Sequence, residues 1–455
     1  MKRGLSRRAL LGGSISIGVL AACQQATPST TETKNVEKVV TQVVGNQATV
    51  IPAPAAKPQA TITFWGHENH PLDAAIPGFE AQNPNIKVKA EHLGDWLVKF
   101  KATLASGADV PDLIWLAPGD GQDLGAKGVL LDVTDVVAPN KDKFIKGKLV
   151  EVQLAKTGKY VAVPGDTALS GLWYRQDLLE KAGMKELPKD LTFDDWLTQA
   201  AEIKKETGAA AFLLPTSGWT YQYEALLSQN GGSVTSLDGT TVTIDDAKGI
   251  ETMSQVKKIW DTGTTLDADW LKPPYWAAVK GGKLAADYMP SWMRGFIAGE
   301  LKTATEGLGQ WRCAPLPKTP NGISRTCQIG GASVVSTRFT KAPEAVKAFM
   351  QYAFITMEGA AAVGGWGIIP SYLPYLESPQ FQNQKSPVFG DFLFSKVWAS
   401  LANELSTTYA RTGVFSEATT ILTQEMMPIL RGDVSVQAGV KTIGDRVREA
   451  NGRYQ

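Results

Sequence analysis

Residues 60–93, ATITFWGHENHPLDAAIPGFEAQNPNIKVKAEHL, carry the pattern that decides the fold. The first run alternates β-favouring residues and breaks at Gly66, which predicts a strand. The segment DAAIPGFEAQNP predicts a helix that stops at Asn83-Pro84, because a proline disfavours helical geometry in the residue before it. NIKVKAEHL predicts the next strand. The stretch therefore indicates a strand–helix–strand unit.

The following residues, DWLVKFKATLASGADVPDLIWLAPGD at 95–120, continue this order. They predict a helix, a proline-marked break, a buried strand at 113–116 and a Gly/Pro loop. Such alternation predicts a parallel sheet flanked by helices, which is an α/β fold. Ligands of open parallel sheets gather at the carboxyl ends of the strands. Residues at these strand ends are therefore binding candidates: Trp65, His67, Glu68 and Asp120.

Length and composition narrow the range of functions. The chain has 455 residues, more than one hydrophobic core usually serves, so two lobes are expected. The net charge is +1 and no basic cluster appears beyond the N-terminus, which argues against a nucleic-acid partner. Thirteen tryptophans are many, and several stand beside Gly or Pro, outside any regular helical stripe. A single tryptophan more often packs in a core than contacts a ligand, but these loop positions favour ligand contact.

The N-terminal segment has the organisation of an export signal. Four basic residues (Lys2, Arg3, Arg7 and Arg8) precede an apolar run, residues 9–22, that is too short for a bilayer-spanning helix of roughly 20 residues. Leu20-Ala21-Ala22-Cys23 resembles the lipobox of bacterial lipoproteins, which implies a signal peptide at 1–22 and a lipid on Cys23; a stray cysteine in an ordinary signal is the alternative. SRRALL also resembles a twin-arginine signal, and the Sec route remains open.

Residues 23–59 are rich in Thr, Val, Gln, Ala and Pro. Such a segment buries little, so we expect a flexible tether there and assign it no fold.

The two remaining cysteines lie in WRCAPLPKTPNGISRTCQI. Pro320-Asn321-Gly322 is a turn signal, and Cys313 and Cys327 are symmetric about it. In an antiparallel hairpin the two would face each other, and outside the cytoplasm they would oxidise. We therefore predict a Cys313–Cys327 disulfide; two buried thiols are the alternative.

Several motifs together resemble the extracellular solute-binding proteins of sugar ABC transporters, a family that includes the maltose-binding proteins. They occur in family order over residues 60–455: PDLIW, GKYVAVPGDTALSGLWYRQDLLEKAGM, LTFDDWLTQAAEIKK, NGGSVTSLDGTTVTIDDAKGIETMSQVKKIWDTG, VKGGKLAADYMPSW and RFTKAPEAVKAFMQYAFITMEGAAAVGGWGIIP. The resemblance implies a type II periplasmic-binding-protein-like fold, with a ligand cleft between two α/β lobes. Lobe 1 would be 60–165 and 316–365, and lobe 2 would be 168–314 and 368–455. Crossings would fall near 164–165, 315–317 and 367–370, which contain the Gly or Pro that suits hinges.

The resemblance also assigns site residues. YMPSWMRGF matches the segment whose tryptophan stacks on the sugar, here Trp292, with Tyr288 and Arg294 as neighbours. SGWTYQYEALLSQNGG matches a loop whose aromatics cap the ligand. The other contacts implied, including those from the strand-end candidates, are Trp65, His67, Glu68, Asp120, Asp166, Trp219, Tyr221, Gly331, Trp366, Tyr409 and Arg411.

The sequence also contains partial patterns of two other kinds of site. HENH places His67 and His70 three apart, but the HExxH spacing of zinc proteases is missing, so we expect no metal. A glycosidase would need two carboxylates across the scissile bond, and loop acids such as Asp120, Asp166 and Glu68 leave that alternative open. A polyol or another small polar solute is the alternative ligand class.

The resemblance further implies a non-enzymatic carrier without a cofactor. It would bind a carbohydrate by lobe closure and present it to ABC permease subunits. We expect a monomer that is lipid-anchored at the extracytoplasmic face of the membrane.

Overall fold

In the computed structural model the described residues are 40–44, 47–51, 59–67, 70–216, 221–302 and 307–454. They fall into two compact units, Met1–Lys57 and Pro58–Gln455. In the first unit β1 (Val40–Val44) pairs antiparallel with β2 (Gln47–Ile51). We expected no fixed structure in this part of the tether; its Val and Thr residues favour a strand locally.

The second unit begins with a four-stranded sheet in the order β11-β5-β3-β4. Its strands are β3 (Ala60–Gly66), β4 (Ile86–His92), β5 (Leu113–Leu116) and β11 (Ser333–Ser336). β3 runs parallel to β4 and β5, which confirms the parallel sheet predicted for these strands, and β11 adds an antiparallel edge. We call the part built on this sheet lobe 1.

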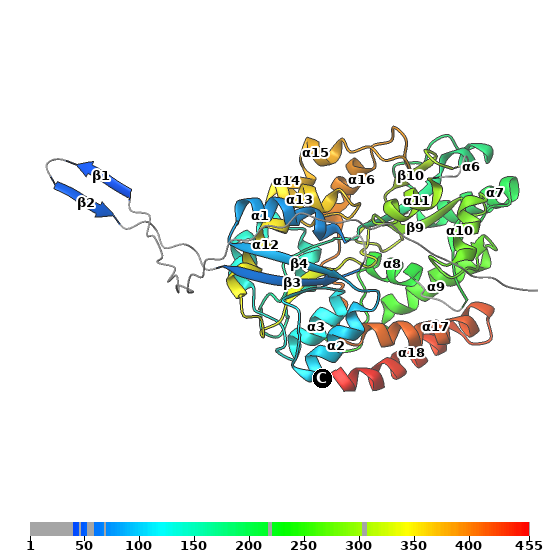
Figure 1. Cartoon of the computed structure of the whole chain (residues 1–455). Helices are drawn as coiled ribbons and strands as arrows, with labels where there is room; N and C mark the ends of the chain where they lie inside the picture. Colours follow the sequence, from blue (N-terminus) through cyan, green and yellow to red (C-terminus); the bar gives the residue numbers. More distant parts are fainter. Residues whose placement is uncertain are drawn as a thin grey trace, which may run out of the picture. The chain divides into compact units, whose positions relative to one another are not determined.

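The helices of lobe 1 cover the sheet with their apolar faces. Helix α1 follows β3 and ends at Gln82, just before the Asn83-Pro84 stop, as the sequence predicts. α1 and α12 lie beside the β3–β4 pair (Figure 1), and α13 packs against α12 and η1. The helical segments are η1 (Pro71–Ala75), α1 (Ile76–Gln82), α2 (Trp96–Ser106), α3 (Pro118–Ala126), α4 (Thr134–Val137), η2 (Ala138–Lys143), α5 (Lys146–Val152), α12 (Pro343–Ile355) and α13 (Met357–Gly364).

A second sheet, in the order β10-β6-β9, is antiparallel throughout. Its strands are β6 (Ser170–Arg175), β9 (Ala286–Pro290) and β10 (Trp311–Ala314), and a small parallel pair is formed by β7 (Phe212–Leu213) and β8 (Thr265–Leu266). We call the part built on this sheet lobe 2. Its first helices are α6 (Gln176–Lys181), α7 (Phe193–Thr207), α8 (Tyr221–Gln229), α9 (Ala247–Asp261), α10 (Pro273–Lys280) and α11 (Met293–Leu301).

Helix α7 shows how local sequence sets these elements. The Thr192 hydroxyl caps the helix by accepting from the Asp195 N–H, and Gly208, at φ +71°, ends it. The buried positions between them follow the helical period and form one apolar face: Phe193, Trp196, Ala200 and Ile203.

The C-terminal quarter is helical and returns to both lobes. α14 packs against α13, α16 packs against β10, and α17 and α18 lie side by side (Figure 1). The segments are α14 (Leu373–Leu376), α15 (Pro379–Gln382), α16 (Phe394–Leu401), η3 (Ala402–Glu404), α17 (Phe415–Arg431), α18 (Val436–Asn451) and η4 (Gly452–Tyr454). Within the described residues no helix combines the length and apolarity needed to span a membrane.

Three extended segments run side by side between the sheets, and we call them the crossing segments: 165–170, 327–332 and 367–371. The first is central. The Asp166 N–H donates to the Ala332 carbonyl over 3.0 Å, and the Thr167 N–H donates to the Ile369 carbonyl over 2.8 Å. Bridges pair Leu169 with Gln328 and Asp166 with Pro370.

The second crossing lies later in the chain than expected. Residues 316–326, which we expected in lobe 1, stay on lobe 2: Lys318 pairs with Thr192, and the Ile323 N–H donates to the Gln229 carbonyl over 2.8 Å. Pro317 and the Pro320-Asn321-Gly322 turn therefore shape a loop on lobe 2, and the chain crosses at 327–332.

The predicted disulfide is wrong in this structure, since Cys313 and Cys327 are buried free thiols. Both lie against β6, at different positions along it. Cys313 pairs with Trp173, whereas the Cys327 carbonyl accepts from the Ser170 N–H over 2.9 Å. The segments on either side of the turn pair with each other at Leu316, whose N–H donates to the Arg325 carbonyl over 2.8 Å. Beyond that point each pairs with β6, so the hairpin does not continue as far as the two cysteines.

Candidate ligand-binding site

A cleft with a volume of about 1100 Å³ opens between lobe 1, α11 of lobe 2 and the crossing segments. The residues around it come from segments far apart in the sequence, and their side chains are mostly apolar. They are His67, Pro71, Trp96, Trp115, Ala117, Asp166, Leu271, Trp292, Gly295, Phe296, Gly299, Glu300, Gly330, Gly331, Ala332, Trp366 and Ile368. This combination of a concave apolar surface and few polar groups is typical of small-molecule sites.

The lobe 1 wall is aromatic. β3 ends at Gly66, where a Cβ atom would lie 2.7 Å from the ring of His70, and the chain turns there to present His67. The His67 ring lies 5.9 Å from Trp96 at the start of α2. Trp96 Nε1 donates to the Trp115 carbonyl over 3.0 Å, which fixes the indole against β5. Rings from three elements thus meet at the carboxyl ends of β3 and β5.

The lobe 2 wall is one face of α11. Trp292, Gly295, Phe296, Gly299 and Glu300 recur at helical spacing, and all line the cleft. Trp292 Nε1 donates to the Ile329 carbonyl over 3.0 Å, and the Trp292 ring lies 5.6 Å from that of Phe296. Phe296 is 41% exposed, so a large ring surface is open to the cleft.

Trp366, directly before the third crossing segment, lies between the two walls. Its ring centroid lies 6.1 Å from that of His67 in lobe 1 and 6.3 Å from that of Phe296 in lobe 2. Because aromatic faces stack on the C–H faces of ring-shaped ligands, a ligand held here contacts both lobes.

The floor of the cleft is polar. Asp166 is buried; its Oδ1 accepts from the Ile369 N–H over 3.1 Å, and burial raises the pKa of its carboxyl to about 7. Gly330 and Gly331 adopt φ of +78° and +75°, a region that favours glycine. A Cβ atom on Gly331 would lie 2.8 Å from the Asp166 carbonyl, so the floor has no space for a side chain there.

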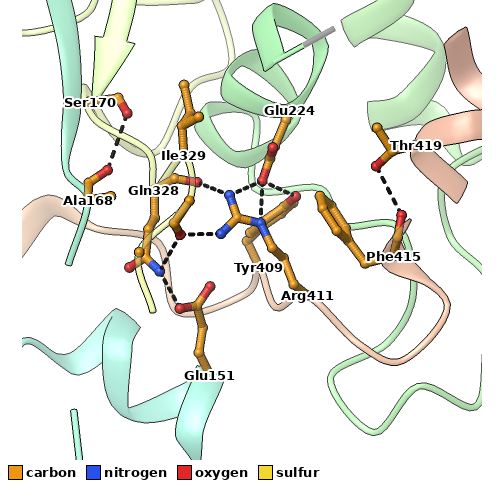
Figure 2. A network of polar contacts seen from close by, with 12 residues as sticks. Glu151, Ala168, Ser170, Glu224, Gln328, Ile329, Tyr409, Arg411, Phe415 and Thr419 are labelled. Atoms are coloured by element: carbon orange, nitrogen blue, oxygen red, sulfur yellow. Dashed lines mark hydrogen bonds and ion pairs between the residues drawn. The ribbon is translucent and has the colours of Figure 1, made fainter. Parts of the chain in front are cut away.

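Behind the floor lies a buried polar network (Figure 2). Arg411 Nε donates to Glu224 Oε1 over 2.7 Å, and the Tyr409 hydroxyl donates to the same oxygen over 2.9 Å. Arg411 also donates to the carbonyls of Gln328 and Gly330, in the second crossing segment. From lobe 1, Glu151 accepts from the Gln328 side chain. Burial raises the pKa of the Glu224 carboxyl, against the opposing effect of Arg411.

Comparison with known proteins identifies the family. Residues 66–354, well over half of the chain, match the bacterial extracellular solute-binding proteins. The chain belongs to this family. A curated relative, the arabinooligosaccharide-binding protein of Halalkalibacterium halodurans, is 25% identical over 378 residues, which cover 76% of this solute-binding protein and 82% of the relative. The arabinooligosaccharide-binding protein of Bacillus subtilis is 23% identical over 315 residues, which cover 66% and 70% of the two chains.

Solved structures show the same fold. The sugar-binding protein MalE of Xanthomonas citri has a TM-score of 0.72 and 20% identity, and the match covers 86% of this chain and 98% of that one. A binding protein of Bifidobacterium animalis subsp. lactis, solved with β-1,6-galactobiose, has a TM-score of 0.71 and 20% identity over 86% and 98% of the chains. The expected two-lobe α/β fold of type II is confirmed, and family membership identifies a binding protein, not an enzyme.

Some residues expected at the site lie elsewhere in this solute-binding protein. Trp65 Nε1 donates to Glu91 on β4 over 3.0 Å, and the ring does not line the cleft. Tyr288 is fully buried. Arg294 is buried over the Phe394 ring and donates to the Gly364 carbonyl over 3.5 Å, so it holds the end of α13, just before the third crossing segment.

Other expected residues support the cleft from behind. The buried Tyr221 hydroxyl donates to Asp287, and its ring lies 4.3 Å from Trp270, which in turn lies 5.2 Å from Trp292. Tyr409 is buried against Glu224. Asp120 and Arg411 line a smaller neighbouring cavity of about 410 Å³, where Asp120 pairs with Lys101 over 2.9 Å.

Three predicted residues, Cys23, Glu68 and Trp219, lie outside the described residues. In the described part of the chain no group of three His, Cys, Asp or Glu side chains is arranged to hold a metal ion. His70 Nδ1 accepts from the Leu72 N–H over 3.2 Å, and burial lowers the pKa of the imidazole to about 2. His70 is therefore a neutral core residue that caps η1.

The sequence interpretation missed Trp96, Trp115, Phe296, Leu271 and Glu300. The sequence predicts a buried strand around Trp115 and an ordinary helix around Trp96, and neither pattern marks a ligand contact. The i, i+4 spacing of Trp292 and Phe296, which puts both rings on one face where the segment is helical, was the available signal.

Proposed function

We propose that this solute-binding protein captures a sugar or oligosaccharide in the cleft and delivers it to an ABC transporter permease. The observation that carries the proposal is the set of aromatic rings on both lobes around a polar floor. A sugar has C–H faces that stack on such rings and hydroxyls that need paired donors and acceptors. The names of the relatives, two of which bind arabinooligosaccharides, support the same ligand class.

Capture proceeds by lobe closure about the crossing segments. Lobe 1 comprises 60–165 and 333–365, and lobe 2 comprises 168–326 and 368–455. A ligand favours the closed form only if it binds that form more tightly than the open one. Stacking on Trp96, which is partly exposed, from one lobe and Trp292 from the other supplies this difference, because the second contact forms only on closure.

Residues 1–22 act as the export signal, and Cys23 carries the lipid that anchors a monomer at the extracytoplasmic face of the membrane. The tether at 23–59 leaves the lobes room to move near their permease. Mass spectrometry of the N-terminal peptide tests this, and we expect a diacylglycerol on Cys23. We expect the Cys23→Ser protein to be released from membranes. An unmodified Cys23 thiol in the membrane fraction contradicts the anchor.

The ligand class is tested by thermal unfolding with a panel of α-1,5-arabinotriose, maltotriose, lactose, β-1,6-galactobiose and sorbitol. A compound that binds only the native state raises the unfolding midpoint by mass action. We expect at least one saccharide to raise the unfolding midpoint. Calorimetry then measures the affinity for this saccharide, and chromatography should show that the protein leaves the saccharide chemically unchanged. A rise with sorbitol alone favours the polyol alternative, and the appearance of new reducing ends favours a glycosidase.

A further inference from the structure

The floor of the cleft contains three consecutive backbone N–H groups, at Gly330, Gly331 and Ala332. All three residues line the cleft and are partly exposed. Across the described residues, none of these N–H groups donates a hydrogen bond to the protein. Backbone donors are rarely left without an acceptor, so these need one from outside the chain.

The carbonyl groups of the same segment are occupied by two buried cations. Arg411 donates to the carbonyl of Gly330, and Lys148 Nζ, which is fully buried, lies 3.4 Å from the carbonyl oxygen of Gly331. In a planar trans peptide the C=O and the following N–H point in opposite directions. The N–H of Gly331 therefore points away from Arg411, and that of Ala332 points away from Lys148.

Neither cation is free to turn to the ligand itself. Arg411 is 3% exposed and paired with Glu224, and Lys148 pairs with Glu151 over 3.2 Å. Each acid comes from a different lobe, Glu151 from α5 and Glu224 from α8. The second crossing segment is thus held from both sides in the conformation with two positive φ angles.

An acceptor for ligand hydroxyls stands next to these donors. The Asp166 N–H donates to the Ala332 carbonyl, and the Asp166 side chain lines the cleft beside Gly331. One Asp166 oxygen accepts from Ile369. A hydroxyl that donates to the Asp166 carboxyl can also accept from a neighbouring N–H, which satisfies both of its hydrogen-bonding roles.

We propose that the N–H groups of Gly331 and Ala332 donate to hydroxyl oxygens of the bound sugar, and that Arg411 is the positioning residue that orients them. This inference rests on the proposed function and adds to it a recognition element made of backbone. Because the donors are backbone groups, no side-chain substitution removes them directly. The ligand class is a neutral polyhydroxyl compound. One of its hydroxyls donates to the Asp166 carboxyl and accepts from an N–H of this segment.

The Gly331 N–H can be observed directly by NMR. Labelling with glycine that carries ¹³C at its carbonyl and ¹⁵N at its amide selects Gly–Gly peptides, which occur at 12–13, 231–232, 281–282, 330–331 and 364–365. Three of these provide internal controls with bonded amides. Gly232 donates to Leu227 over 2.8 Å, Gly365 to Ala361 over 3.2 Å and Gly282 to Val279 over 3.4 Å.

The protein is titrated with whichever of α-1,5-arabinotriose, maltotriose, lactose or β-1,6-galactobiose changes its tryptophan fluorescence. The Gly331 signal is expected to shift and its amide exchange to slow, while the Gly232 and Gly282 signals stay in place. An unchanged Gly331 signal at saturating fluorescence overturns the inference and leaves the proposed function intact. If no sugar changes the fluorescence, the proposed function fails and the inference fails with it.

The role of Arg411 is tested by Arg411→Lys, which keeps the charge but cannot reach both carbonyls as a guanidinium does. Its matched control is Arg448→Lys on an exposed ion pair with Asp245. Arg411→Lys is expected to weaken sugar binding by about tenfold or more and to move the unliganded Gly331 signal, while Arg448→Lys changes neither. Unchanged affinity with a folded Arg411→Lys protein overturns the positioning role, and the wild-type titration decides the amide contact if that variant fails to fold.

Discussion

The Arg411 guanidinium and the Glu224 carboxylate form an ion pair whose side chains are only 4% and 5% exposed. Glu224 lies on α8 and Arg411 on the loop before α17, 187 residues later in the chain. Because Arg411 also binds two carbonyls of the second crossing segment, the pair connects the helical part of lobe 2 to the floor of the cleft.

Removing the acid from this pair should destabilise the protein strongly. Glu224→Ala leaves Arg411 buried without its counter-charge, and losing one partner of such a pair costs about 3–5 kcal/mol. The free energy of unfolding, measured by urea denaturation, should fall by that amount. Glu202→Ala, on the exposed Lys205–Glu202 pair, is the control and should change the free energy by less than about 1 kcal/mol. Equal losses of unfolding free energy for the two substitutions would show that the buried ion pair contributes no more to stability than the exposed one.

The Trp292 ring should contribute much of the ligand affinity. Trp292→Ala removes a stacking face on the lobe 2 wall, and truncation of such an anchor costs about 2 kcal/mol, or about thirtyfold in Kd. Calorimetry with the sugar found in the panel measures the change. Trp260→Ala, on α9 and outside the cleft, is the control that should keep the affinity. An unchanged Kd for Trp292→Ala would exclude stacking on this ring.

Sequence reasoning predicted those parts of the protein that depend on local pattern. The unit β3–α1–β4 could be predicted because the alternation before Gly66 and the stop at Pro84 are short-range signals. His67 and Trp292 follow strand ends, Asp166 and Trp366 lie at crossings, and all four line the cleft.

Long-range partners were not visible in the sequence. Tyr221 and Tyr409 have the residue type of a sugar contact, but their hydroxyls donate to acids 66 and 185 positions away in the chain. The cysteine pairing failed for the same reason, since beyond Leu316 and Arg325 the two segments pair with β6 and not with each other. Trp115 was missed because a strand with four buried residues gives no sign of which ring borders a cleft.

Asp166 should make stability depend on pH. Burial raises the pKa of its carboxyl in the folded protein to about 7, from an ordinary value of 3.8, so the folded state holds the proton more tightly than the unfolded state does. The resulting stabilisation is complete below the unfolded pKa and is lost as the pH rises through about 7. At about 1.4 kcal/mol per pKa unit, the full loss is about 4 kcal/mol.

Asp166→Asn replaces the titrating carboxyl with an amide, so this contribution to the pH dependence of stability disappears. The difference in unfolding free energy between Asp166→Asn and wild type should therefore grow in favour of the variant between pH 4 and 8. Asp132→Asn is the control, because hydrogen bonds from Thr134 and the Lys159 ammonium lower the pKa of this more exposed carboxyl. A difference for Asp166→Asn that stays constant over this range would show that Asp166 ionises at its ordinary pH.

The thiols of Cys313 and Cys327 should be unreactive in the native protein and reactive after unfolding. Both are buried free thiols, and burial raises the pKa of each, so neither forms the nucleophilic thiolate at neutral pH. A maleimide applied without reductant should label neither residue in the native state and both in urea, as shown by peptide mass spectrometry. Cys313→Ser and Cys327→Ser should each remove one of the two labels without changing the other. If urea exposes no thiol until reductant is added, the two cysteines form a disulfide. In that case the pairing of each cysteine with β6 is wrong, and the segment 313–327 folds differently.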